Sequence, residues 1–239
     1  MGSFEDLRKK CIKETKKKVK ESVKADNFII QSIKNIDEII KVSNILIKRL
    51  REWYELSNPE FSRSVRDHGK FIELILEKKD KKEKESMGAD FSKEDMGPIL
   101  KLASEINELY KLKQKQEDYL HELMQKTCPN LTAVAGYLIG AKLIALAGDL
   151  KKLVEFPSST VQLLGAEKAL FRHMRTGAKS PRHGIIVNHP LISGSPQKEH
   201  GKRARALADK LSLAAKVDYF KGEFIGDKLK KKLEDKFKK

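Results

Sequence analysis

The chain has 239 residues, 39% of them hydrophobic and 35% charged, which is enough for one large or two small domains with packed cores. Its 50 Lys and Arg against 34 Asp and Glu give a net charge of +16, which favours nucleic acid as a partner over an anionic membrane or a merely solubilising surface. No apolar run approaches the roughly 20 residues that span a bilayer, and Cys11 and Cys128 form neither a metal-binding pattern nor a disulfide framework, so membrane-spanning and disulfide-stapled classes are excluded.

The positive charge lies mainly in the second half of the chain. Residues 1–128 carry 28 basic and 24 acidic side chains, whereas residues 129–239 carry 22 basic and 10 acidic ones. The net charges of the two halves are therefore +4 and +12. We expect the surface that meets an anionic partner to be C-terminal.

The first predicted element is a Lys-rich amphipathic helix within residues 1–25. Its apolar residues recur at steps of three and four from Leu7 to Val23, and its lysines are expected on the solvent face. It follows Met1-Gly2-Ser3, a start typical of an expression vector. We interpret residues 1–25 as the remnant of a removed domain or as a linker.

Two long segments with heptad spacing predict a second domain over residues 26–127. Apolar residues alternate at steps of four and three from Asp26 to Asn58 and again from Pro98 to Lys126, with Pro98 suited to the first turn of its helix. Two helices of matched length predict an antiparallel coiled-coil hairpin, with a seam closed either within one chain or between two. The predicted seam residues are Ile29, Ile33, Ile36, Ile40, Ile47, Leu102, Ile106, Leu109 and Leu120.

The insert between these helices, residues 57–97, is predicted to contain one further helix and a loop. The helix covers His68 to Lys79, and the charged run of residues 78–85 is expected to be a solvated, mobile loop. Ser92 and Asp95 form a capping box that restarts ordered structure.

The composition changes at residues 127–130, and residues 128–239 are predicted to form a compact helical domain. Ala, Gly and Leu dominate residues 131–154, where small side chains let helices approach closely. Residues 185–187 form a brief β-like run, and further helices are predicted over residues 201–220 and from Gly226 onward.

The stretch most typical of a binding site lies between Phe156 and Gly177. Here a Pro/Ser/Thr loop is predicted to lead into a short basic helix. Gly165 and Ala166 carry almost no side chain, so we expect backbone N–H groups at the helix start to approach a phosphate closely.

The predicted basic helix presents a row of positive charge. Lys168, Arg172 and Arg175 follow one another at helical spacing. Glu167 is expected to pair with a neighbouring basic side chain or to hold Lys168 in place. The alternative is that these cations form an ordinary solvated helix face.

The basic excess continues through residues 156–216, which contain eleven Lys and Arg and three acidic residues. Positive side chains on a helix start and on two loops suit the irregular backbone of a folded RNA. His183, beside Arg182 in a loop flanked by Pro and Gly, is predicted to stack on an unpaired base. The alternative for His183 is a loop residue that caps a helix.

Patterns typical of catalysis are absent from the sequence. The chain has no P-loop, and no G-x-G-x-x-G follows a predicted strand. His173, His183, His189 and His200 fall on different predicted elements without cysteine or clustered carboxylates, so we predict no metal site. The sequence supports no catalytic residue, and no cofactor is expected.

An extended set of motifs resembles the Nop-domain family. The segment Gly165-Ala-Glu-Lys-Ala-Leu-Phe-Arg172, preceded by Pro157-Ser-Ser-Thr160 and Gln162, is similar to the signature of the Nop domain. Further matching segments are residues 53–54, 58–60, 86–88, 129–131, 140–148, 201–206 and 214–218. The resemblance runs from Asp26 onward and is strongest to the archaeal Nop scaffold of box C/D small ribonucleoproteins.

The resemblance implies an all-α protein in which an antiparallel coiled-coil domain precedes a compact helical Nop domain. It implies a non-enzymatic scaffold that recognises a box C/D guide RNA with a kink-turn, together with a small ribosomal-type kink-turn-binding protein. The coiled coil is expected to dimerise. Guide-directed ribose 2′-O-methylation would be carried out by fibrillarin, which docks on an N-terminal domain that we expect this chain to lack. The expected location is cytoplasmic in archaea and nucleolar in eukaryotes, with no membrane partner.

The residues expected to meet the RNA combine the Nop signature with the basic helices and loops around it. They are Gln162, Gly165, Ala166, Glu167, Lys168, Arg172, His173, Arg175, Lys179, Arg182, His183, Lys202, Arg203 and Arg205. Two alternatives stay open. One is a spliceosomal-type Nop protein that binds a kink-turn RNA without methylation, and the other is a helical enzyme that uses the basic groove as a substrate site.

Overall fold

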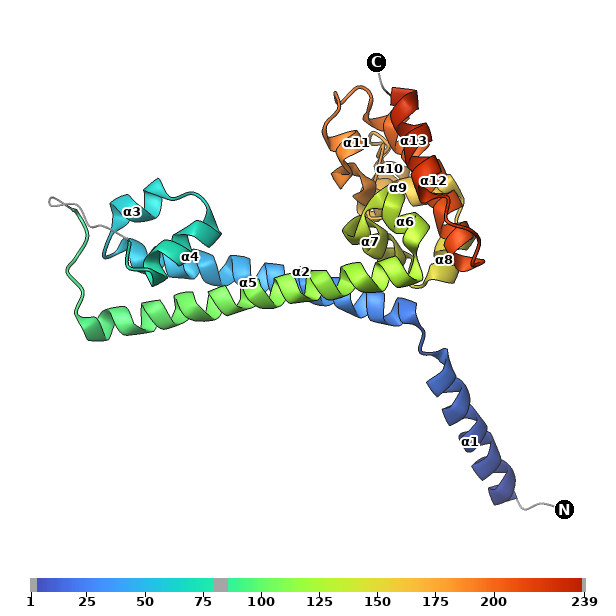
Figure 1. Ribbon diagram of the computed structural model, residues 1–239, viewed down its shortest axis with the longest axis horizontal. Helices are drawn as coiled ribbons and strands as arrows, with labels where there is room; N and C mark the ends of the chain where they lie inside the picture. The colour runs from blue at the N-terminus through green and yellow to red at the C-terminus, as the bar shows by residue number, and fades with distance from the viewer. Residues whose placement is uncertain (1–3, 80–85, 238–239) are drawn as a thin grey trace. The chain divides into compact units, whose positions relative to one another are not determined.

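The computed structural model describes residues 4–79 and 86–237, and the regular elements within these ranges are helical (Figure 1). The predicted all-α class is therefore confirmed. The chain divides into two compact units. Residues 34–119 form the hairpin unit, and the residues up to 33 together with those from 120 onward form the basic unit. The domain boundaries at residues 25 and 127 stay predictions.

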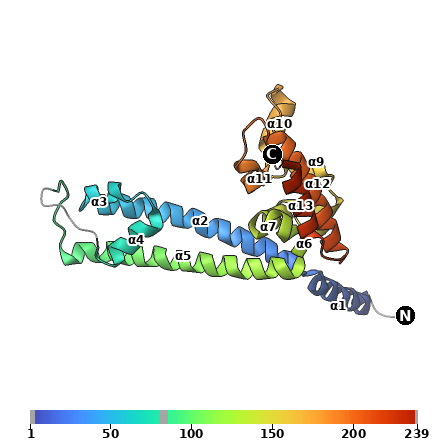
Figure 2. The same cartoon turned by 45° about the horizontal axis from the view of Figure 1, so that its top comes forward.

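The hairpin unit is built on two long antiparallel helices, α2 (Ala25–Glu55) and α5 (Lys93–Thr127), which run beside each other in both ribbon views (Figures 1 and 2). The short helices α3 (Pro59–Ser64) and α4 (His68–Leu76) complete the unit. Its core includes the fully buried Tyr54 and Phe71, whose rings meet edge to face with 5.5 Å between their centroids. Aromatic side chains of this size bury a large apolar area, and the cluster they belong to also contains Ile47 of α2 and Ile106 of α5, so the insert shares one core with the long helices.

Arg51 anchors the insert to α2. Its guanidinium donates hydrogen bonds to the carbonyl oxygens of Ser62 at 2.8 Å and Val65 at 2.7 Å, and it lies 4.1 Å over the ring of Phe71. The last carbonyls of a helix have no intrahelical partner, so this side chain satisfies the C-terminal end of α3. The sequence does not predict α3, because six residues are too few to show a helical period.

The predicted seam is buried within a single chain. Three predicted seam residues, Ile40, Leu102 and Leu109, are only half-buried. Next to Ile40 in the sequence, Ile39 is the more deeply buried residue. The seam residues that are at most 1% exposed are Ile29, Ile33, Ile36, Ile47, Ile106 and Leu120. These side chains reach their burial without a second copy, so the hairpin is closed within the chain, and dimerisation stays a prediction.

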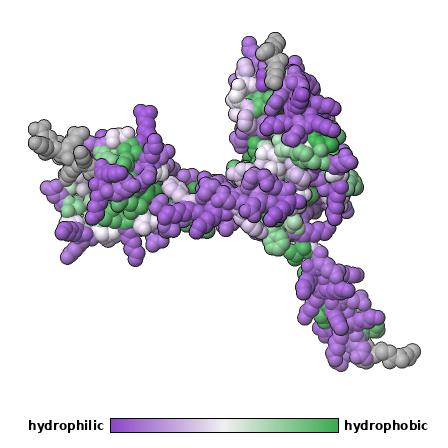
Figure 3. Space-filling model, in the orientation of Figure 1, coloured by the Kyte–Doolittle hydropathy of each residue, from purple (hydrophilic) through white to green (hydrophobic). Residues whose placement is uncertain are grey.

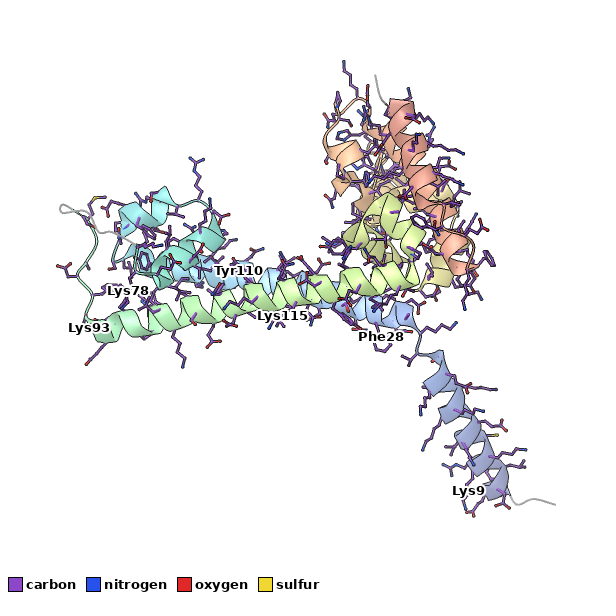
Figure 4. All side chains as sticks on the ribbon, in the orientation of Figure 1. Lys9, Phe28, Lys78, Lys93, Tyr110 and Lys115 are labelled. Carbon is purple, nitrogen blue, oxygen red and sulfur yellow. The ribbon has the colours of Figure 1, made fainter. Side chains whose placement is uncertain are left out.

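The second long helix begins earlier than predicted, at Lys93 (Figure 4). Ser92 Oγ accepts the N–H of Asp95 at 3.1 Å and donates to the carboxylate of Asp95 at 2.6 Å, so the predicted capping box opens α5 itself. Pro98 therefore lies inside the helix and not in its first turn. It removes one intrahelical donor close to the N-terminus. Residues 80–85 of the predicted charged loop lie outside the described residues.

The basic unit is centred on α12, whose Ala- and Leu-rich face is buried against α6, α8, α9 and α13. Small residues allow the close packing that the sequence predicted, since a Cβ added to Gly140 would lie 2.9 Å from Met124 Cε. In chain order its helices are α1 (Phe4–Ser22), α6 (Pro129–Ala135), α7 (Tyr137–Ala147), α8 (Leu150–Glu155), α9 (Ser158–Leu163), α10 (Glu167–Thr176), η1 (Ile185–Asn188), α11 (Pro190–Ser193), α12 (His200–Tyr219) and α13 (Gly226–Phe237).

The N-terminal helix α1 forms over the predicted residues, and none of its side chains is buried. Its surface is mostly hydrophilic, with small hydrophobic areas between the hydrophilic ones (Figure 3). The apolar residues that the sequence pattern placed on one face of this helix, such as Leu7 and Val19, are therefore exposed.

Two local predictions in the basic unit are wrong. The predicted Pro/Ser/Thr loop contains α9, which begins directly after Pro157. The predicted β-like run forms η1, a turn of 3₁₀-helix in which the N–H of Val187 donates to the carbonyl of Gly184. The apolar character of this run serves burial and not strand pairing, because Ile186 is fully buried.

Candidate nucleic-acid interface

The Nop-like signature forms the corner between α9 and α10. Gly165 turns the chain there with a φ of +86°, a conformation that side chains other than glycine rarely adopt. A Cβ at this position would also lie 3.3 Å from Cβ of Ile185, so the corner packs directly against η1.

The backbone N–H groups of this corner are used inside the protein. The N–H of Gly165 donates to Oε1 of Glu167 at 2.7 Å, and the N–H of Ala166 donates to the carbonyl of Leu163 at 2.9 Å. These two N–H groups are therefore occupied in this structure, and the approach of the helix start to a phosphate stays a prediction. Glu167 closes the corner through the backbone of Gly165 instead of pairing with a basic side chain.

Helix α10 is an exposed basic helix that follows this corner. None of its residues is buried, and Lys168, Arg172 and Arg175 are all exposed. Phe171 and Met174 are also solvent-exposed, at 66% and 72%. This helix can therefore present cations and apolar side chains to a partner at the same time.

The loop over residues 177–184 is held against α9. Nε2 of Gln162 donates to the carbonyl of Arg182 at 2.6 Å, and the N–H of Gly184 donates to the carbonyl of Gln162 at 2.8 Å. A Cβ at Gly184 would lie only 1.8 Å from the carbonyl oxygen of Leu164. Gln162 is therefore a positioning residue for the loop, and glycine is required at position 184.

His173 has a structural role at the other end of the loop. Its Nδ1 is hydrogen-bonded to the carbonyl of Ala178, just after Gly177 ends α10 with a φ of +67°. The ring thereby fixes the C-terminal end of α10. His173 is among the residues predicted to meet the RNA, and this contact uses one of its ring nitrogens.

Two neighbouring grooves lie beside this loop. They share Ser180 and Arg182. The first, of about 740 Å³, is lined by Ser158, Gln162, Ser180, Pro181, Arg182, Gly201, Lys202, Arg205, Ala206, Asp209 and Lys236. The second, of about 450 Å³, is lined by Lys179, Ser180, Arg182, His183, Gln197, Lys198 and His200.

The grooves bring together predicted residues from three parts of the chain. Gln162, Lys202 and Arg205 line the first groove, Lys179 and His183 line the second, and Arg182 lines both. The grooves are also lined by residues that the sequence does not predict to meet the RNA, namely Ser158, Ser180, Lys198 and Lys236. Lys236 lies among many lysines of α13, and no pattern in the sequence distinguishes it from its neighbours.

His183 and His200 face each other in the second groove, with 5.6 Å between their ring centroids. Burial lowers the pKa of His183, and the neighbouring His200 lowers it further. A neutral ring is suited to the predicted stacking on a base, which stays a prediction.

Arg203 is engaged inside the protein. Its guanidinium forms an ion pair with Glu199 at 2.8 Å, donates to the carbonyl of Leu191 at 3.3 Å and lies 4.9 Å from the centroid of the Phe237 ring. Its side chain is only 19% exposed. Unlike Lys202 and Arg205, it lines neither groove, so it links α12 to the segments around it.

Two further findings concern other kinds of site. Within residues 4–79 and 86–237, no three His, Cys, Asp or Glu side chains come together in a way that could hold a metal ion. No single helix in the described part of the chain is long and apolar enough to cross a membrane; α6 and α7 meet that test only as a pair, and they are bent by 114°.

Comparisons with known proteins point to one family. The family model described as Nop, snoRNA binding domain, fibrillarin, matches residues 35–239. An uncharacterized NOP5 family protein of Methanocaldococcus jannaschii is 42% identical over 97% of this chain and 62% of its own length. Nucleolar protein 56 of Dictyostelium discoideum is 37% identical over 94% of this chain and 47% of its own length. The chain therefore spans less than two-thirds of the length of either relative.

A solved structure agrees with these relatives. A chain in the crystal structure of a fibrillarin/Nop5p complex is 29% identical to this one, with a TM-score of 0.59. The match covers 97% of this chain and 78% of that chain. The helical fold of this chain thus also occurs in a protein that has been solved in a fibrillarin/Nop5p complex.

Proposed function

The chain belongs to the Nop family, and on that premise we propose that it is an RNA-binding scaffold of a box C/D ribonucleoprotein. In this role it recognises a kink-turn RNA together with a small kink-turn-binding protein. It carries out no chemistry itself and supports ribose 2′-O-methylation by fibrillarin within the assembly. The similar solved structure, a complex of fibrillarin with Nop5p, supports this assembly as the context.

The single observation that carries the proposal is the gathering of exposed cations on the basic unit. Lys168, Arg172 and Arg175 project from α10, while Arg182, Lys202 and Arg205 line the adjoining grooves. Such a surface attracts the phosphates of a nucleic acid by releasing bound counterions. Cations spread over a helix, a loop and a second helix suit an irregular RNA better than a regular duplex.

We further propose that the exposed apolar residues of α10 contact the kink-turn-binding protein. Phe171 and Met174 lie beside the cations Arg172 and Arg175. A composite site of this kind requires both protein surfaces, because apolar contacts to the partner add to phosphate contacts with the RNA.

A gel-shift comparison tests the proposal. Kink-turn RNA is mixed with this protein, with the kink-turn-binding protein, and with both. We expect the protein to shift the RNA much more strongly when the small protein is already bound. Equal binding in the presence and absence of the small protein would contradict the composite surface.

Self-association is the second part of the proposal. The predicted seam residues are buried within one chain, so a dimer that keeps this hairpin must use other side chains. Val42, Ile45 and Leu112 are exposed apolar residues on the long helices of the hairpin unit, at 45%, 63% and 42%. We propose that they form the contact between two copies.

A further inference from the structure

We propose that the two grooves of the basic unit form one track for the phosphate backbone of a single-stranded RNA segment, with α13 forming part of its wall. The inference rests on the proposed RNA-binding function and deepens it, because it says that the concave surface binds single-stranded RNA. The projecting helix α10 is left to contact helical RNA.

Arg182 makes the track continuous. It lines both grooves, together with Ser180. Its backbone carbonyl is held by Gln162, and its Nη1 donates to the carbonyl of Gln197 at 3.3 Å. A strand that leaves one groove therefore meets the same fixed guanidinium as it enters the other.

The charge along the track is strongly positive. Asp209 is the single carboxylate among the residues that line the track. It lies 2.8 Å from Nζ of Lys210, whose positive charge offsets that of the carboxylate. The lining cations are Lys179, Arg182, Lys198, Lys202, Arg205 and Lys236. They come from the loop after α10, the approach to α12, α12 itself and α13, and a polyanion that passes between these segments relieves their mutual repulsion.

The shape of the track favours single-stranded RNA over an RNA duplex. The first groove is lined in part by small residues, Ser158, Ser180 and Gly201, which leave room for a backbone to enter. Proteins reach the bases of RNA mainly in unpaired segments, whose backbone can follow a concave surface, whereas a duplex is contacted across its outside by projecting elements. The grooves are concave and α10 projects with no buried residue, so the two surfaces suit different parts of a folded RNA.

The test compares two variants with equal loss of charge. The groove variant combines Lys202→Gln, Arg205→Gln and Lys236→Gln, which remove lining cations. The control combines Lys228→Gln, Lys231→Gln and Lys232→Gln, which are exposed residues of α13 that line neither groove. Binding of a short oligouridine and of a short RNA duplex is followed by fluorescence anisotropy over a range of salt concentrations.

We expect the groove variant to lower the slope of log K against log salt for oligouridine by about 2, since each phosphate contact to a single strand contributes about 0.7. The control variant should keep the wild-type slope, and duplex binding should change little in both. Unfolding in urea verifies that the exposed substitutions leave the protein folded.

Three results overturn the track alone. The first is an equal loss of slope in the groove and control variants, and the second is an equal loss on oligouridine and duplex by the groove variant. The third is an unchanged slope in the groove variant although the wild type binds oligouridine. A wild-type protein that binds neither probe, and does not bind a kink-turn RNA that carries the small kink-turn-binding protein, would overturn the proposed function and the track with it.

Discussion

Asp218, near the end of α12, caps the start of α6 through Asn130. Its Oδ1 accepts hydrogen bonds from the backbone N–H and the side-chain Nδ2 of Asn130, at 3.0 and 2.8 Å. Its Oδ2 accepts the N–H of Leu131 at 2.8 Å. Oδ1 of Asn130 in turn accepts the N–H of Ile225, just before α13. One largely buried carboxylate thus joins three helices, and the positive N-terminal end of α6 stabilises its charge.

Replacing this carboxylate should destabilise the basic unit. Asp218→Ala leaves buried donors without an acceptor, and we expect the free energy of unfolding to fall by about 3 kcal/mol. Asp218→Asn keeps one oxygen acceptor and should lose less. Urea unfolding measures the change, with Asp209→Ala, an exposed site on the same helix, as the control. Equal stabilities of Asp218→Ala and the control would contradict the capping role.

His189 should make the stability depend on pH. Its Nδ1 accepts the N–H of Leu191 at 3.2 Å, so the proton is on Nε2, which donates to the carbonyl of Val134 at 3.0 Å. Burial lowers the pKa of His189 from the usual 6.5. As the pH falls below 6.5, the unfolded chain binds a proton before the folded one does. The contribution of His189 to stability is therefore fully present above pH 6.5, and it is lost as the pH falls toward the lowered pKa of the folded protein.

Urea unfolding at a series of pH values checks this prediction. His189→Gln keeps a donor and an acceptor but does not titrate, so its stability should decline less than that of the wild type on acidification. Burial also lowers the pKa values of His183 and His68, so the variant keeps a decline of the same sign from these two groups. A variant with the wild-type pH profile would rule out His189 as the titrating group.

Gly184→Ala tests the close approach between the loop and α9. A Cβ there would lie 1.8 Å from the carbonyl oxygen of Leu164, so the backbone must move, and we expect a loss of about 3 kcal/mol or more. Gly201→Ala is the matched control, since its Cβ would only reach ordinary contact with Arg182 at 3.8 Å. In the first turn of α12 it should be neutral or stabilise by about 0.5 kcal/mol. Thermal unfolding of both variants gives the comparison.

Charge reversal on α10 tests its role in RNA binding. Lys168→Glu with Arg172→Glu should weaken the ternary complex with kink-turn RNA and the small protein. It should also reduce the slope of log K against log salt by about 2. Lys48→Glu with Lys70→Glu makes the same change of charge on exposed residues of the hairpin unit and should alter the slope little. A salt slope that stays at the wild-type value in the α10 variant would mean that these residues do not contact phosphates.

The hairpin unit offers a matched pair of isoleucines. Ile106 is fully buried, so Ile106→Asp places an unpaired charge in the core and should lower the free energy of unfolding by about 4 kcal/mol. Ile45 is exposed, so Ile45→Asp should leave folding nearly unchanged while weakening the proposed dimer. Sedimentation equilibrium measures the mass. If the wild type has the mass of a dimer and Ile45→Asp has the same mass, Ile45 does not form the contact between the two copies.

Much of the fold could be predicted from local patterns. The heptad spacing on both sides of the insert indicates the two long helices, and the Ala-rich period over residues 201–220 indicates α12. The resemblance to the Nop family was carried by a run of motifs from Asp26 onward, and the comparisons confirm it. The segments that were wrong, α9 and η1, are too short for a periodic signal, so burial of Val161 and Ile186 decided their form.

The candidate site could be predicted only in part from the sequence. The sequence by itself determined the family, the helical class and the basic character of the C-terminal half, because composition, period and motif are local properties of the chain. Only the tertiary structure decided which of the basic and polar groups remain open to a ligand. It places Arg203 against the carbonyl of Leu191 and the ring of Phe237. It also uses Gln162 to hold the carbonyl of Arg182 and brings Lys236 to the groove beside Arg205. The partners of a polar group depend on which distant segments pack beside it, and the spacing of residues along the chain does not encode that choice.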